Sequence, residues 1–282
     1  MLRPYLHPLL LTLGLSLASR PGLAVEVVTS PETNSAPSAA GKSADDLAKQ
    51  LANPVAALIS VPLQNNFDFG LGANDGWRYT LNIQPVIPIS IGEEWNLISR
   101  TILPVVHQQD VFGSSTQSGL SDTVQSLFLS PKEPTPGGWI WGAGPVLLLP
   151  TATDDRLGTE KWGAGPTGVA LKQDGSWTYG VLANHLWSYA GKESRADVNA
   201  TFLQPFVTYA LGKGQTVTVL SENTYDWDQS QWSVPLGLTY ARVTKLGSQL
   251  VSFGFGAKYY VDGPSGGPEW GLRAVITLLF PK

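Results

Sequence analysis

The feature that most constrains this chain is an alternation of apolar and polar side chains that begins after Pro54. The clearest run spans Trp77 to Ser90, where every second residue from Trp77 to Ile89 is apolar and the first residues between them are polar. Successive side chains on a strand point to opposite faces, so this spacing predicts a strand with one apolar face. Three later runs repeat the pattern, with apolar faces over Trp232–Tyr240, Val251–Tyr259 and Trp270–Phe280.

Each of these apolar faces begins or ends with an aromatic residue. Membrane barrels carry an apolar outer band flanked by aromatic girdles, whereas a soluble sandwich buries its apolar face and turns its polar face to water. Only 14% of residues are charged, against roughly 25% in an average soluble domain. We therefore expect an all-β fold, an antiparallel transmembrane β-barrel whose small and polar face lines the interior.

The alternation divides the chain into strands joined by turns. An even strand count is typical of bacterial barrels, and about twelve strands are expected. The candidate strands lie near residues 56–69, 76–90, 94–107, 119–130, 138–150, 161–172, 176–188, 198–211, 215–227, 231–243, 248–260 and 268–281. Those near 119–130, 161–172 and 176–188 alternate poorly, so the barrel prediction rests least on them.

The connections between these strands alternate in length. Tight turns lie at 90–93, 173–175, 212–214 and 245–247, and longer connections lie at 108–119, 151–160, 189–197 and 261–268. Two connections break this rule: 131–137 is long for its side, and 229–230 is short for its side. Bacterial barrels have short periplasmic turns and longer outside loops, so the tight turns predict the periplasmic end.

The N-terminus predicts export. Arg3 precedes an apolar run from Leu9 to Ala18, which is too short for a membrane span of about 20 residues. We expect a signal peptide over 1–24, a linker with a short helix over 25–53, and the barrel over 54–282. The predicted location is the outer membrane of a Gram-negative bacterium. Its expected partners are the outer-membrane lipid and the barrel assembly machinery. Many outer-membrane barrels end with an aromatic residue on the lipid-facing side, and Phe280 fills that role here, although Pro281 and Lys282 follow it.

A short helix is predicted from Ser43 to about Asn53. Ser43 can cap this helix, and Asp45 and Asp46 follow in its first turn, where the helix dipole favours acids. Leu47 and Leu51 lie four residues apart on one face. Two interpretations stay open, a local capped segment and a helix that docks on or into the periplasmic mouth.

Five charged side chains are predicted to face the lumen. A charge on the lipid face near the bilayer centre would cost about 2–4 kcal/mol, so inward placement is favoured. They either line a pore that sets ion preference or orients substrate, or form an internal salt-bridge network that fills the barrel. These lumen candidates are Arg78, Arg100, Glu222, Lys258 and Arg273.

The chain offers little for catalysis or metal binding. It has no Cys and three His, of which His7 falls in the signal peptide, so a zinc site is not expected. His185 and Ser188 lie three apart and would point to opposite faces of a strand. An acidic loop cluster either binds Ca²⁺ or is a solvated loop neutralised by Arg156 and Lys161; it comprises Asp154, Asp155 and Glu160. We expect no cofactor, no metal, no nucleic-acid partner and no enzyme activity.

Residues 43 to 282 resemble a bacterial family labelled "transporter" or, by misnaming, neuromedin U, related to the barrels grouped as the meta-pathway of phenol degradation family. The resemblance is carried by the segments at 65–69, 74–78, 158–163 and 266–273. It implies an outer-membrane barrel and uptake of small aromatic or apolar compounds. The expected function is a passive channel or transporter for small solutes of unknown identity. The alternatives are a closed structural or binding barrel with a plugged lumen, or a lipid-modifying outer-membrane enzyme for which His107 and His185 are candidates.

Overall fold

The computed structural model describes residues 43–281, which form one short helix and fifteen strand segments. The predicted signal peptide and most of the linker lie outside these residues. The elements are α1 (Ala44–Leu51), β1 (Ile59–Leu71), β2 (Gly76–Ile83), β3 (Val86–Ile91), β4 (Trp95–Gln109), β5 (Thr116–Leu120), β6 (Thr123–Pro131), β7 (Trp139–Leu149), β8 (Lys161–Asp174), β9 (Trp177–Gly191), β10 (Asn199–Gly212), β11 (Gln215–Ser221), β12 (Asn223–Asp226), β13 (Gln231–Leu246), β14 (Gln249–Asp262) and β15 (Trp270–Phe280).

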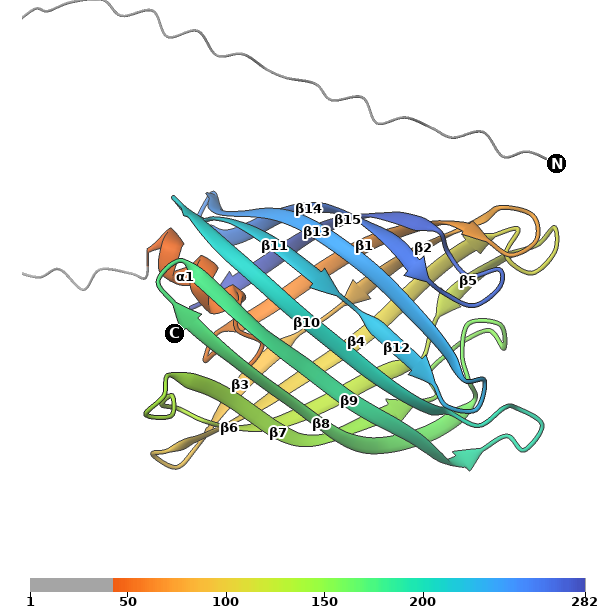
Figure 1. Ribbon diagram of the computed structural model, residues 1–282, viewed down its shortest axis with the longest axis horizontal. Coiled ribbons are helices and arrows are strands. Elements are labelled where there is room, and N and C mark those ends of the chain that lie inside the picture. The colour runs from red at the N-terminus through yellow and green to blue at the C-terminus, as the bar shows by residue number, and fades with distance from the viewer. Residues whose placement is uncertain (1–42, 282) are drawn as a thin grey trace, which may run out of the picture. The chain divides into compact units, whose positions relative to one another are not determined.

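These segments build a closed antiparallel barrel of twelve strands, as predicted (Figure 1). Three barrel strands are interrupted, at Gln84–Pro85, at Ser121–Asp122 and at Glu222. The two halves of each interrupted strand share a neighbour: β2 and β3 both pair with β1 and β4, β5 and β6 with β4, and β11 and β12 with β10 and β13. Pairing of β1 with β15 closes the ring.

The outer face of the barrel is apolar. On β15 the exposed side chains are Trp270, Leu272, Ile276 and Phe280, which alternate with residues that face inward. Aromatic rings gather near the strand ends and contact their neighbours on adjacent strands. Examples are Phe69 stacked on Trp270 at 4.4 Å and Trp177 against Tyr209 at 4.7 Å between ring centroids. The alternation and the aromatic ends therefore have the predicted orientation.

The interior is not polar throughout, which corrects the expectation from the sequence. Part of the inner wall is a buried apolar cluster formed by β4, β6, β8, β9 and β10 with Val55 of the α1–β1 link. Its strand residues are Ile98, Phe128, Val169, Leu171, Leu182 and Phe206. The strands near 119–130, 161–172 and 176–188 alternate poorly because both of their faces are partly apolar. One glycine in this wall is required by close packing, since a Cβ on Gly165 would collide with the carbonyl oxygen of His185.

The two ends of the barrel differ. At one end, called the turn end, the links β3–β4, β8–β9, β10–β11 and β13–β14 are tight, and only the β6–β7 link at 132–138 is longer. At the other end, called the loop end, the links at 150–160, 192–198 and 263–269 are long, whereas the β12–β13 link at 227–230 is short. These two exceptions to the length rule are those that the sequence predicts, and the β1–β2 link at 72–75, which is also short at the loop end, is a third that it does not.

Helix α1 packs at the turn end. Ser43 caps it through a reciprocal capping box: the Asp46 N–H donates to Ser43 Oγ, and the Ser43 N–H donates to the Asp46 carboxylate. Leu47 and Ala48 are buried against Leu58 and against Val243 and Leu279 of the inner wall. Burial of one such leucine contributes about 2 kcal/mol, so the interpretation of a docked helix holds. Within residues 43–281, no helix is long and apolar enough to cross a membrane.

Candidate functional site in the barrel lumen

The lumen contains adjoining cavities. The central cavity has a volume of about 560 Å³ and is lined by inward side chains of ten strand segments, among them β2, β4, β10 and β15, together with Gln84 and Glu222. A second cavity of about 250 Å³, the helix cavity, lies between the central cavity and α1. A third, the outer cavity of about 370 Å³, lies at the loop end and shares Thr224 with the central cavity. The central and helix cavities share Gln84, Arg100, Gln204, Thr218 and Leu220.

Arg273 and Glu222 form a bidentate ion pair in the central cavity. The two terminal nitrogens of Arg273 donate to the two carboxylate oxygens of Glu222 at 3.1 and 2.6 Å, and its Nε donates to Asn66 Oδ1 at 2.8 Å. Register explains this meeting: Arg273 faces Asn66 across the β1–β15 pair, and Glu222 lies in the interruption between β11 and β12. Both residues are sequence-predicted lumen candidates, and both carboxylate oxygens of Glu222 are occupied.

Lys258 is paired with a residue that the sequence interpretation did not single out. Its Nζ lies 2.8 Å from Asp68 Oδ1, and both side chains are nearly buried. The Tyr260 hydroxyl donates to the same carboxylate at 3.3 Å. Asp68 lies on the inward face of β1, where polar and apolar residues alternate. That alternation in the sequence could have predicted that Asp68 faces the lumen. Arg78, which faces Asp68 across β1–β2, donates instead to Gln108 Oε1 at 2.7 Å.

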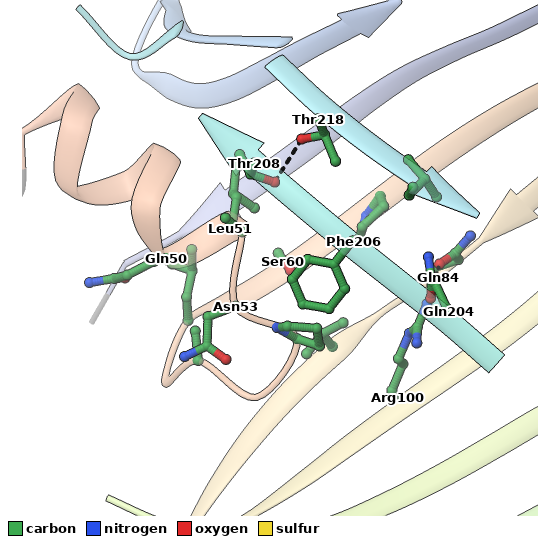
Figure 2. Close-up of a pocket in the computed structure, with 17 residues that line it drawn as sticks. Gln50, Leu51, Asn53, Ser60, Gln84, Arg100, Gln204, Phe206, Thr208 and Thr218 are labelled. Atoms are coloured by element: carbon green, nitrogen blue, oxygen red, sulfur yellow. Dashed lines mark hydrogen bonds between the residues drawn. The ribbon is translucent and has the colours of Figure 1, made fainter. Parts of the chain in front are cut away.

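Arg100 differs from Lys258 and Arg273. It lines both the central and the helix cavity, and its one side-chain hydrogen bond within residues 43–281 is from Nη2 to Gln84 Oε1 at 3.3 Å. None of the ion pairs in this part of the chain includes it. Figure 2 shows Arg100, Gln84 and Gln204 together on the side of the pocket opposite α1, with the Phe206 ring between them and the helix.

The helix narrows the turn end and is tied to the wall there. The Gly214 N–H donates to Asp45 Oδ1 at 2.6 Å, and Gln173 Nε2 donates to the Lys49 carbonyl at 2.8 Å. Gln50 and Leu51 of α1 line the helix cavity (Figure 2). The chain before β1 therefore forms part of the lumen wall as well as a cover for it.

The histidines lie outside this site. His107 Nδ1 is 2.6 Å from Ser118 Oγ, and His185 Nδ1 is 2.7 Å from Thr201 Oγ1. Ser188 instead donates to Asp197. His185 and Ser188 therefore have separate partners, and the structure does not bring them together.

The acidic loop cluster is neutralised by residues other than those expected. Glu160 pairs with Lys192 and Arg195 at the loop end, whereas Lys161 pairs with Asp197 at 2.9 Å. Hydrogen bonds from Lys161 and then Ser188 lower the pKa of the Asp197 carboxyl below its usual range. No group of three or more potential ligands suited to a metal ion occurs within residues 43–281.

No protein-family model matches the chain, and no curated protein matches it. Among solved structures it is similar to an outer membrane channel from Pseudomonas putida F1, with a TM-score of 0.62 and 16% identity over 79% of this chain and 94% of that chain. A weaker likeness is to outer membrane phospholipase A from Escherichia coli, with a TM-score of 0.45 and 11% identity over 80% and 90%. Another is to the KdgM porin in complex with disordered oligogalacturonate, at 0.42 and 10% over 79% and 99%. The first likeness shows the fold of an outer-membrane β-barrel; the particular family that the sequence resembles stays a prediction.

Proposed function

We propose that this protein is an outer-membrane channel for small solutes, with α1 at the periplasmic end restricting the passage. The observation that carries the proposal is the succession of adjoining cavities inside a closed barrel, from the outer cavity through the central cavity to the helix. Tight turns are typical of the periplasmic end of such barrels, which sets the orientation. Small solutes would enter from the loop end and leave past α1.

The closed barrel with a plugged lumen is the second candidate, and two observations favour it. The Arg273–Glu222 and Lys258–Asp68 pairs join neighbouring walls, and α1 buries Leu47 in the mouth. A lipid-modifying enzyme is the third candidate: His185 and Ser188 have separate hydrogen-bond partners, whereas His107 Nδ1 lies 2.6 Å from Ser118 Oγ.

Conductance separates the two candidates. Purified, folded protein in planar bilayers should give discrete conductance steps in KCl, and a variant lacking residues 25–53 should give larger steps because the helix no longer narrows the mouth. A variant lacking only 25–42 keeps the helix and is the matched control, for which unchanged steps are expected. If folded wild type and both deletions were all non-conducting, the channel proposal would be wrong and the plugged barrel correct.

A further inference from the structure

Arg100 forms no direct ion pair within residues 43–281. The acidic group that shares its cavity, Glu222, already accepts from Arg273 with both oxygens. Asp68 is held by Lys258. A guanidinium has five N–H donors, and only the bond to Gln84 engages one of them within residues 43–281. The remaining donors are therefore available to a ligand in the lumen.

A second polar group lies beside Arg100 in the same position. Gln204, on β10, lines both the central and the helix cavity, and its side-chain amide makes no hydrogen bond within the described part of the chain. Figure 2 places it next to Arg100 and Gln84. Both side chains face the cavity and have donors that no protein acceptor engages within residues 43–281. Such donors are suited to an oxygen-bearing anion, since arginine binds carboxylates in a bidentate manner.

The wall around this polar group is apolar. Aliphatic and aromatic side chains of β4, β6, β9, β10 and β11 line the central cavity, namely Ile102, Val124, Leu182, Phe202 and Leu220. Phe206 continues this surface into the helix cavity. The volume of the central cavity, about 560 Å³, falls within the range of small-molecule sites, about 300–1,000 Å³. A ligand held at Arg100 would thus contact hydrocarbon with the rest of its body.

The charge balance selects the sign of the ligand. The charged residues that line the central cavity are two cations, Arg100 and Arg273, and one acid, Glu222, so this part of the lumen carries excess positive charge. Cationic solutes are repelled and monoanions attracted. A dianion would leave one of its charges against the apolar wall, where desolvation is costly.

We propose that the lumen holds a binding site for small amphiphilic monocarboxylates, in which Arg100 and Gln204 bind the carboxylate and the apolar wall receives an aromatic or aliphatic body. This inference rests on the proposed function, because it names the class of solute that the channel would select. It gives a role to Arg100, which like Arg78 forms no ion pair within residues 43–281 but, unlike Arg78, lines the central cavity.

Calorimetric titration of the refolded protein in detergent tests the site without any need for conductance. The probes are benzoate and its neutral isostere benzamide. Wild type should bind benzoate at least about tenfold more tightly than benzamide, the effect of a charge-assisted hydrogen bond. Arg100→Gln should abolish this preference and Arg100→Lys should keep part of it. The matched control is Arg242→Gln, which removes an exposed arginine from β13 and should change nothing.

Several outcomes would overturn the inference. These are equal binding of the two probes by wild type, no benzoate binding at all, or an undiminished benzoate preference in folded Arg100→Gln. Should Arg100→Gln not fold, Gln204→Leu tests the same site and should weaken benzoate binding by about threefold or more; unchanged binding would contradict the proposal. A wild type that binds benzoate but passes no KCl current would refute the channel and leave the binding site standing.

Discussion

The Arg273–Glu222 contact shows how the lumen tolerates charge. Both side chains are mostly buried, and each donor of the guanidinium edge meets its own carboxylate oxygen at 3.1 and 2.6 Å. Moving two charges out of water is costly, and their attraction offsets that cost only when the geometry is good. Loss of one partner leaves the other uncompensated, so the pair matters more as a constraint than as a source of net stability.

We therefore expect Glu222→Gln to destabilise the barrel by about 2 kcal/mol, below the value for a fully dry pair because the lumen retains water. The measurement is urea unfolding of the refolded barrel, followed by tryptophan fluorescence. Glu93→Gln, at an exposed acid in a turn, is the control and should have little effect. The double variant Glu222→Gln/Arg273→Gln should recover part of the loss. A double variant as unstable as the sum of its single changes would mean that the two side chains do not interact.

At the scale of elements, α1 is held by few contacts. Its ties to the wall are the Asp45 and Lys49 hydrogen bonds and the buried face of Leu47 and Ala48. Elements with few buried contacts open more readily than those in the core. The helix is thus the part of the lumen wall best suited to move, whereas every strand segment except β5 pairs with at least two neighbours.

A disulfide can test that motion, since the chain has no cysteine of its own. A Cβ on Gly214 would lie 2.9 Å from Ala44 Cβ, so Ala44→Cys with Gly214→Cys should crosslink after a small shift of the helix. Gly214 has a positive φ of +73, so a cysteine there adds roughly 1–2 kcal/mol of backbone strain. The oxidised protein should show small conductance steps that enlarge on reduction. Neither single-cysteine variant should respond to reductant; equal steps before and after reduction would indicate a static helix.

The strands were predictable because each has one continuous apolar face. All twelve predicted segments correspond to observed strands, to within a few residues. The interior was less predictable. Phe128, Leu171 and Leu182 face inward, and a period-two pattern cannot show an inner wall that is itself apolar. Docking of α1 was also open, because Leu47 alone does not indicate what covers it.

The pairing of lumen charges was predictable only in part. Arg273 and Glu222 were both expected to face inward, but their contact depends on how far strands are staggered around the ring. Lys258 and Asp68 lie on β14 and β1 with β15 between them, so only the closed barrel brings them within 2.8 Å. The free guanidinium of Arg100 follows from these pairings and could not be read from its own neighbours in the sequence.

At the scale of the whole molecule, the bilayer should impose a depth-dependent cost on the outer face. Leu238 and Leu246 both lie on β13 and are 56% and 68% exposed, the first in the middle of the strand and the second at its end. Leu238→Arg should cost about 2–4 kcal/mol and Leu246→Arg about 0–1. The readout is unfolding from lipid vesicles, with heat-modifiable gel migration to confirm folding. Equal costs at the two positions would contradict the predicted placement of the membrane.

The pairing of β1 with β15 joins residues that are far apart in sequence, Ile59 opposite Phe280. A ring of this kind has no halfway product: until β15 is synthesised, β1 keeps an open edge that could pair with any other strand. Closure must also wait for almost the whole chain, and long-range contacts form slowly. The consequence is a built-in delay that leaves time for translocation and for escort to the membrane. Once β1 and β15 have paired, no strand edge is left open. The same long-range pairing that slows folding then opposes unfolding of the barrel.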